Sequence, residues 1–157
     1  MQNPERCTRG RNLTGGVTGV GKALTAEDVH QSVRRYWDAF RAKSEQRLRE
    51  LYGRSSTTFE VGGLRTEPGK LGAARRAREY FHREAQFDVQ LGAVEVALLG
   101  ETTAVASYTF KFQARQRRTA PGKMQDESFD VVRATQVFGV EDGDVRIMHE
   151  HFSAPVG

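Results

Sequence analysis

The sequence is poor in the residues and segments that mark several classes of protein. Cys7 is the only cysteine among 157 residues, which excludes an intrachain disulfide and a metal cluster held by cysteines. Apolar runs are too short to cross a membrane, and charged residues make up 28% of the chain. Residues 1–24 lack the continuous apolar centre of a secretory signal, because Gly, Thr and Arg interrupt them. We therefore expect a cytoplasmic globular protein that contacts no membrane.

Signals for nucleotides and nucleic acids are also weak. The segment GGVTGVGK, residues 15–22, has neither a preceding strand nor the full spacing of a phosphate-binding loop. The net charge of +4 comes mostly from residues 1–24, which hold four basic residues against one acidic residue. Arg75, Arg76 and Arg78 are interleaved with Ala and Glu, and we predict that they lie on a solvated face. We expect no cofactor and no nucleic-acid partner.

The hydrophobic pattern divides the chain into a tail and one domain. Residues 1–24 show no apolar periodicity and are predicted to form a disordered tail, whereas residues 25–157 are long enough to bury a core. Thr25 is suited to cap a helix, with Asp28 three positions later, and apolar residues then recur at helical spacing. Two further helices are predicted at residues 45–52 and 71–83.

From Phe87 onward, apolar and polar residues alternate, which is typical of strands. The alternation slips by one residue at Gly92, which predicts a β-bulge. Asp142 and Gly143 form a hairpin signal, and strands of this length must bend. We therefore predict an α+β fold in which helices lie across the concave face of a curved antiparallel sheet. The predicted strands are residues 56–61, 87–98, 104–115, 124–140 and 144–153.

The last hairpin resembles a known family. Residues 133–155, RATQVFGVEDGDVRIMHEHFSAP, combine an Arg-x-Thr-x-Val strand, an Asp-Gly turn and a His-x-His-x-Ser ending. With the order of elements, this pattern is similar to the SnoaL-like group of the NTF2-like superfamily, and to the association domain of calcium/calmodulin-dependent protein kinase. Residues 59–81 resemble the family's loop and third helix, so the resemblance covers residues 25–155. Val145 differs, because the family commonly has Trp there.

This resemblance implies a cone-shaped half-barrel with a pocket between sheet and helices, and a homodimer through the outer face of the sheet. Family members include isomerases, cyclases, dehydratases and epoxide hydrolases that act on apolar small molecules. Others are noncatalytic assembly domains, and the fold alone does not choose between these classes. The two hypotheses are therefore a small-molecule enzyme or binding protein with an apolar pocket, and a noncatalytic dimerisation domain.

The segment IMHEHFS, residues 147–153, holds two histidines whose role depends on the direction in which they point. Because side chains alternate along a strand, Met148 and Glu150 are predicted to share one face, and His149 and His151 the other. The resemblance to the kinase association domain places the even-numbered side toward the pocket. The aromatic side of residues 104–115 supports the same choice. The histidines are then predicted to point outward, beside Ile147, Ser153, Arg133 and Thr135.

Glu150 is the main catalytic candidate, because a carboxylate beside an aromatic pocket has a raised pKa that suits proton transfer. The alternative is a buried carboxylate that only bonds to Gln136 or a tyrosine. His151 is the second catalytic candidate, if a bulge reverses the faces. A metal site would need a third ligand beside His149 and His151, so we expect none. The predicted ligand-binding residues are Trp37, Phe59, Tyr80, Tyr108, Phe110, Phe112, Gln136, Met148 and Phe152.

Overall fold

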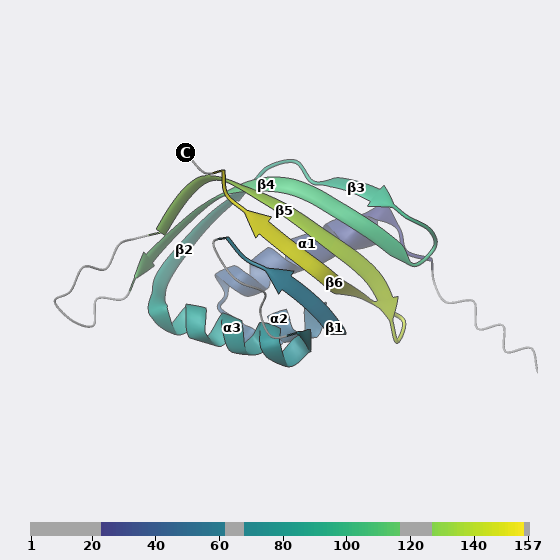
Figure 1. Ribbon diagram of the computed structural model, residues 1–157, viewed down its shortest axis with the longest axis horizontal. Helices are drawn as coiled ribbons and strands as arrows, with labels where there is room; N and C mark the ends of the chain where they lie inside the picture. Colours follow the sequence, from purple (N-terminus) through teal and green to yellow (C-terminus); the bar gives the residue numbers. More distant parts are fainter. Residues whose placement is uncertain (1–22, 62–67, 117–126, 156–157) are drawn as a thin grey trace, which may run out of the picture.

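The computed structural model describes residues 23–61, 68–116 and 127–155. This part of the chain forms three helices and a six-stranded sheet that curves strongly without closing into a barrel (Figure 1). The predicted α+β fold is confirmed, whereas the predicted tail up to residue 22 and the turn at residues 119–123 lie outside the described residues. In chain order the elements are α1 (Ala26–Arg41), α2 (Glu45–Leu51), β1 (Tyr52–Phe59), α3 (Gly69–Arg83), β2 (Glu84–Leu91), β3 (Glu95–Leu98), β4 (Thr103–Gln116), β5 (Glu127–Glu141) and β6 (Asp144–Ser153).

Five strands lie side by side in the order β1, β6, β5, β4 and β2, and β3 pairs with β4 beyond the end of β2. β1 runs parallel to β6, and the other pairs are antiparallel. Leu91 of β2 lies opposite Phe110 of β4, and Glu95 of β3 lies opposite Ser107 of β4. The edge strands therefore advance four residues while β4 advances three, so the edge carries one extra residue. The predicted slip at Gly92 is confirmed as the break between these two edge strands.

α1 begins at the predicted cap and packs across the inner face of the sheet. The N–H of Asp28 donates to the Thr25 hydroxyl, and the N–H of Thr25 donates to the Asp28 carboxylate, which forms a capping box. The apolar side of the helix is buried, and Trp37 packs on the ring of Phe110 with centroids 4.6 Å apart. Leu24 is also buried, so the packed domain begins one residue earlier than the sequence predicted.

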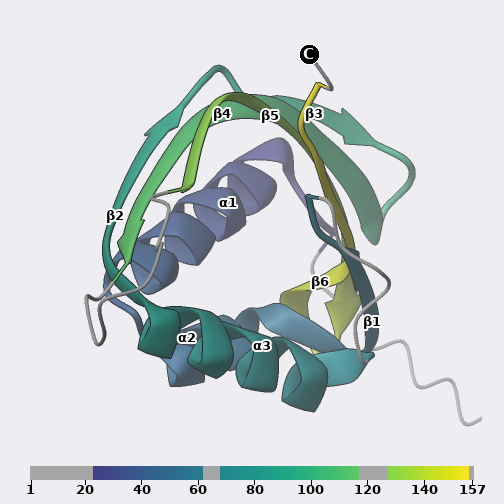
Figure 2. The ribbon, with the colours of Figure 1, turned by 60° about the vertical axis from the view of Figure 1, so that its left-hand side comes forward.

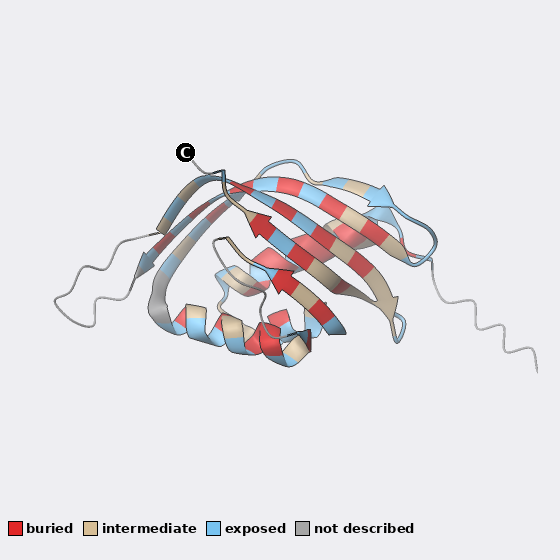
Figure 3. Ribbon diagram, in the orientation of Figure 1, coloured by how far each residue is buried: buried red, intermediate tan, exposed pale blue. Residues whose placement is uncertain are grey.

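The helices and the sheet form two layers with the core between them. α1 crosses beneath the concave face of the sheet, while α2 and α3 lie below its open side (Figure 2). Buried and exposed residues alternate along β4 and β5 (Figure 3), and the buried apolar residues of both strands belong to the core. Within the described residues, no helix is long and apolar enough to cross a membrane.

A β-bulge at Met148 changes the faces of β6. Phe138 of β5 lies opposite Ile147, but the preceding Val137 lies opposite His149, which leaves Met148 as an extra residue. Ile147 is therefore buried in the core, contrary to the prediction, and the regular alternation resumes only from His149. Met148, which the sequence predicts to bind a ligand, does not line the cavity between the sheet and the helices.

The extra side chain of the bulge occupies space beside two glycines. A Cβ atom built on Gly53 of β1 would lie 2.8 Å from the Met148 sulfur. A Cβ built on Gly139 of β5 would lie 3.0 Å from the Met148 Cγ. Because both distances are shorter than an ordinary van der Waals contact, the two glycines provide the room that the bulged side chain needs.

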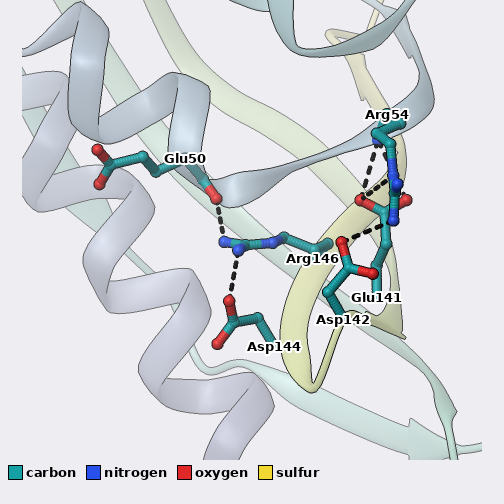
Figure 4. Close-up of polar contacts among 6 residues, drawn as sticks. All are labelled: Glu50, Arg54, Glu141, Asp142, Asp144 and Arg146. Carbon is teal, nitrogen blue, oxygen red and sulfur yellow. Dashed lines mark hydrogen bonds and ion pairs between the residues drawn. The ribbon is translucent and has the colours of Figure 1, made fainter.

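Two arginines attach the hairpin between β5 and β6 to neighbouring segments (Figure 4). Arg146 donates to the backbone carbonyl of Glu50 at the end of α2 and pairs with Asp144. Arg54 of β1 pairs with Asp142 in the turn at 2.6 Å. Asp142 and Gly143 both have positive φ angles, which confirms the predicted two-residue turn.

Candidate functional site

An aromatic cavity of about 170 Å³ lies between the inner face of the sheet and the helices. Nine of its seventeen lining residues are aromatic, and they come from α1, α3 and the strands of the sheet. Polar side chains reach the wall at two places, one formed by Tyr36, Tyr52, Glu60 and Arg76, and the other by Tyr80 and Glu127. The cavity therefore combines a large apolar surface with a few localised polar groups.

Glu150 lies directly behind the first of these polar places. Its side chain is completely buried, and it does not itself line the cavity. The Tyr52 hydroxyl donates to one carboxylate oxygen at 2.9 Å, and the Gln136 amide donates to the other at 2.7 Å. Glu150 points inward because it follows the bulge at Met148 and pairs with Gln136 across β5 and β6. Tyr52 thus stands between the carboxylate and the cavity.

A series of hydrogen bonds leads from Trp37 on α1 to Glu150. The Trp37 indole N–H donates to the Tyr108 hydroxyl at 3.1 Å, and Tyr108 donates to the Gln136 carbonyl oxygen at 3.0 Å. Indole can only donate, so the direction of every bond in this chain is set by Trp37. The Gln136 amide group must then present its N–H to Glu150, which suits an ionised carboxylate.

Arg76 lies near the same oxygen of Glu150 that accepts the hydrogen bond from Tyr52. Its guanidinium donates to the Tyr52 oxygen at 3.1 Å and lies 3.6 Å from the nearer oxygen of Glu150. The Nε atom of Arg76 pairs with Glu60 at 2.6 Å. Arg76 is mostly buried, whereas Glu60 is 41% exposed. The polar end of the cavity is therefore a row of two carboxylates with one guanidinium between them.

Burial dominates the titration behaviour of this network. Burial raises the pKa of Glu150, and the opposing effects of Arg76, Gln136 and Tyr52 do not cancel it. Burial and the negative charge of Glu150 raise the pKa of Tyr52 and of Tyr108 well above the usual value. Burial opposes the charge of Arg76, but nearby Tyr52, Glu60 and Glu150 outweigh it and raise its pKa. The tyrosines and Arg76 therefore stay protonated at neutral pH, and Glu150 holds its proton more strongly than an exposed carboxylate does.

The structure brings together most of the residues that the sequence indicated. Tyr108 and Gln136 are buried behind the wall in the hydrogen-bonded chain rather than in the wall itself. Phe59 is 38% exposed and packs against His149 and His151 on the outer face, so it is not part of the cavity. The predicted residues that line the cavity are Trp37, Tyr80, Phe110, Phe112 and Phe152.

The two histidines lie on the outer face of β6. His151 is exposed opposite Thr135, and the Nδ1 atom of His149 is 2.7 Å from the Thr57 hydroxyl. Burial, and then nearby His151, lower the pKa of His149. The described residues contain no group of three or more metal-ligating side chains. His151 is therefore separated by the sheet from the cavity.

Sequence reasoning missed Arg76 and Tyr52. Arg76 was assigned to a solvated face, but its side chain is only 17% exposed. A usable signal existed, because Ala73, Arg76, Ala77 and Tyr80 recur at the spacing of one helix face and the other three are apolar or aromatic. The predicted second helix included Tyr52, whereas the structure ends α2 at Leu51 and Tyr52 takes an extended conformation opposite β6.

The sequence of this chain matches one known protein family. The profile of a family described as the SnoaL-like domain matches residues 29–157. A search of curated proteins gave no match.

Solved structures with the same fold include proteins of several kinds. A candidate dehydratase of the NTF2-like family from Streptomyces avermitilis is 15% identical with a TM-score of 0.71, over 83% of this chain and 97% of that one. A hexachlorocyclohexane dehydrochlorinase LinA-type3 from Novosphingobium barchaimii is 10% identical, with a TM-score of 0.70 over 83% and 86%. A candidate association domain of calcium/calmodulin dependent protein kinase II from Xanthomonas campestris is 17% identical, with a TM-score of 0.66 over 84% and 89%. At these identities the similarity shows a shared fold.

Proposed function

The chain belongs to the SnoaL-like domain family, and on that premise we propose that its cavity binds a small apolar molecule and exchanges a proton with it. One observation carries this proposal: the buried carboxylate of Glu150 accepts a hydrogen bond from the hydroxyl of Tyr52, a residue of the aromatic cavity wall. A carboxylate whose pKa is raised by burial is suited to proton transfer near neutral pH.

Tyr52 is the relay between ligand and carboxylate. A proton leaves the ligand for the Tyr52 oxygen while Tyr52 passes its own hydroxyl proton to Glu150, over the 2.9 Å hydrogen bond. The ligand keeps the electron pair of the broken bond, and Glu150 becomes a neutral carboxylic acid. Because its pKa is raised, Tyr52 transfers the proton without remaining ionised. The guanidinium of Arg76, 3.1 Å from the Tyr52 oxygen, stabilises negative charge that develops there.

The reaction class that fits this arrangement is an isomerisation or an elimination. Both begin with loss of a proton from the substrate, and the relay supplies the acceptor. Two structures with this fold carry the names dehydratase and dehydrochlorinase, which denote eliminations in those proteins. The apolar wall of the cavity adds the low-polarity surroundings in which such a carboxylate is an effective base.

The test is exchange of a carbon-bound proton for deuterium in a small ketone. Acetophenone has exchangeable protons beside its carbonyl group and only one ring, which suits a cavity of about 170 Å³. We expect the protein in D₂O to speed their exchange, measured by NMR, and Glu150→Gln to slow it by at least tenfold, because general base catalysis typically contributes about 10²–10⁴ in rate. Tyr52→Phe removes the relay and should have a similar effect. Glu79→Gln, on the exposed side of α3, is the control.

Binding is measured separately from exchange. Trp37 is the only tryptophan of the chain and lines the cavity, so its fluorescence reports a bound ketone directly. Glu150→Gln should bind acetophenone while exchanging its protons slowly. The parent's exchange rate should rise with pH as Glu150 ionises, and this rise should vanish in Glu150→Gln. Unchanged exchange in both variants would refute the relay, and an absence of binding and exchange would favour the noncatalytic assembly domain.

A further inference from the structure

The dimensions of the cavity restrict the size of its ligand. Its volume of about 170 Å³ is close to that of cavities of about 150 Å³ that hold benzene. Pockets for drug-sized ligands usually measure about 300–1,000 Å³. A second fused ring would therefore have to displace side chains from the wall, where close packing makes displacement costly.

The wall is suited to a flat ring. Trp37, Phe110 and Phe152 are in mutual contact, with ring centroids between 4.6 and 6.1 Å apart and their planes inclined to one another. Phe40 and Tyr80 continue the same aromatic surface from α1 and α3. Inclined rings expose both faces and edges, which are the surfaces that a further aromatic ring prefers to contact.

The charges at the polar end restrict the ligand further. Arg76 is the one cationic residue of the cavity wall within the described part of the chain. Its charge is shared by Glu60 at 2.6 Å and by Glu150 at 3.6 Å. A negatively charged ligand at this end would have to separate Arg76 from Glu60 or place a third negative charge beside the same guanidinium. Both alternatives are unfavourable in a buried site.

From these three observations we infer that the ligand is a molecule with one ring and no negative charge. This inference rests on the proposed function and specifies the substrate class of the same site. A neutral hydroxyl or carbonyl group on the ring can meet Tyr52 and Arg76 without disturbing the ion pair of Arg76 with Glu60. A carboxylate on the same ring cannot.

The experiment compares three probes of equal skeleton: benzyl alcohol, benzylammonium and benzoate. Each is titrated into the protein at neutral pH, and binding is followed by the fluorescence of Trp37, confirmed by calorimetry. We expect benzoate to bind at least about tenfold more weakly than benzyl alcohol, because it adds a charge beside two carboxylates. Benzylammonium should bind more tightly than benzoate. 2-Naphthylmethanol, which adds a second ring, should bind more weakly than benzyl alcohol.

Two variants test whether Glu60 causes the weaker binding of benzoate than of benzyl alcohol. Glu60→Gln leaves Arg76 with a single carboxylate, so the ratio of benzoate to benzyl alcohol affinity should rise by about tenfold. Glu79→Gln removes an exposed carboxylate from α3, the helix that carries Arg76, and should leave that ratio unchanged. A ratio that rises equally in both variants would show a general effect of protein charge and overturn the assignment to Glu60.

Tighter binding of benzoate than of benzyl alcohol by the parent protein would overturn the charge inference. Tighter binding of 2-naphthylmethanol would overturn the size inference. These outcomes are independent of the proton-transfer test. If the predicted order of affinities holds and Glu150→Gln exchanges the ketone normally, only the relay fails. If the order is reversed and exchange depends on Glu150, only the ligand class fails.

Discussion

Replacing Gln136 by Leu tests whether the buried network holds an ionised Glu150. The two side chains are similar in volume, and Gln136 is completely buried, so the change removes polar atoms from the interior with little change in shape. It leaves one oxygen of Glu150 without the amide donor at 2.7 Å, and it leaves the Tyr108 hydroxyl without its acceptor at 3.0 Å.

The expected decrease in stability follows from the loss of these two hydrogen bonds. A hydrogen bond to a charged group contributes about 1.5–3 kcal/mol, and a buried hydroxyl left without a partner costs about 1–3 kcal/mol. We therefore expect Gln136→Leu to lower the free energy of unfolding at pH 8 by about 3–5 kcal/mol. For a domain of this size the melting temperature should fall by roughly 10–20 °C.

The loss should depend on pH with a definite sign. The hydrogen bond from Gln136 lowers the pKa of Glu150, against the larger effect of burial, which raises it. Without Gln136, the pKa of Glu150 in the folded protein rises further above its value in the unfolded chain. A raised folded-state pKa stabilises the protein below the unfolded pKa, and this stability is lost as pH rises through the folded pKa. The difference between variant and parent should therefore widen from pH 5 to pH 8.

Urea unfolding at several pH values measures this difference. Gln113→Leu on the exposed side of β4 is the matched control, and it should change stability by less than about 0.5 kcal/mol. A loss for Gln136→Leu that is constant from pH 5 to pH 8, or larger at pH 5, would refute the coupling between Gln136 and the charge of Glu150.

Two further predictions concern other parts of the fold. Gly69→Ala should destabilise the protein by at least about 2 kcal/mol, because Gly69 has a φ of +82° and its added Cβ would lie 2.5 Å from the carbonyl oxygen of Arg54. Gly143→Ala, with the same φ and open space around it, should cost about 1 kcal/mol, and equal losses in thermal unfolding would contradict the steric argument. We also propose a homodimer through the exposed outer face of the sheet; His151→Asp should weaken it in analytical ultracentrifugation, whereas a monomeric parent or an unaffected dimer would disprove it.

The sequence alone determined the features that depend on neighbours along the chain. The capping box of Thr25 and Asp28, the break at Gly92 and the turn at Asp142 and Gly143 were all predicted and are all present. Each of these features follows from backbone geometry or from hydrogen bonds over a few residues. The resemblance in residues 133–155 identified the family, which the profile match confirms.

The contact of Glu150 with Gln136 was expected from the sequence, but only the tertiary structure decided which other side chains meet them at the candidate site. The bulge at Met148 places Ile147 and Glu150 on the same side of β6, an arrangement that strict alternation along the strand forbids. Its position depends on pairing with β5 and on the space beside two glycines, both distant in sequence. Arg76 belongs to a charged run, and its burial follows from contact with Tyr52 and Glu60, at the two ends of β1, and with Glu150 of β6. Packing between these segments sets the surroundings of each charged group, and the helix-face spacing around Arg76 indicates its burial without identifying its partners.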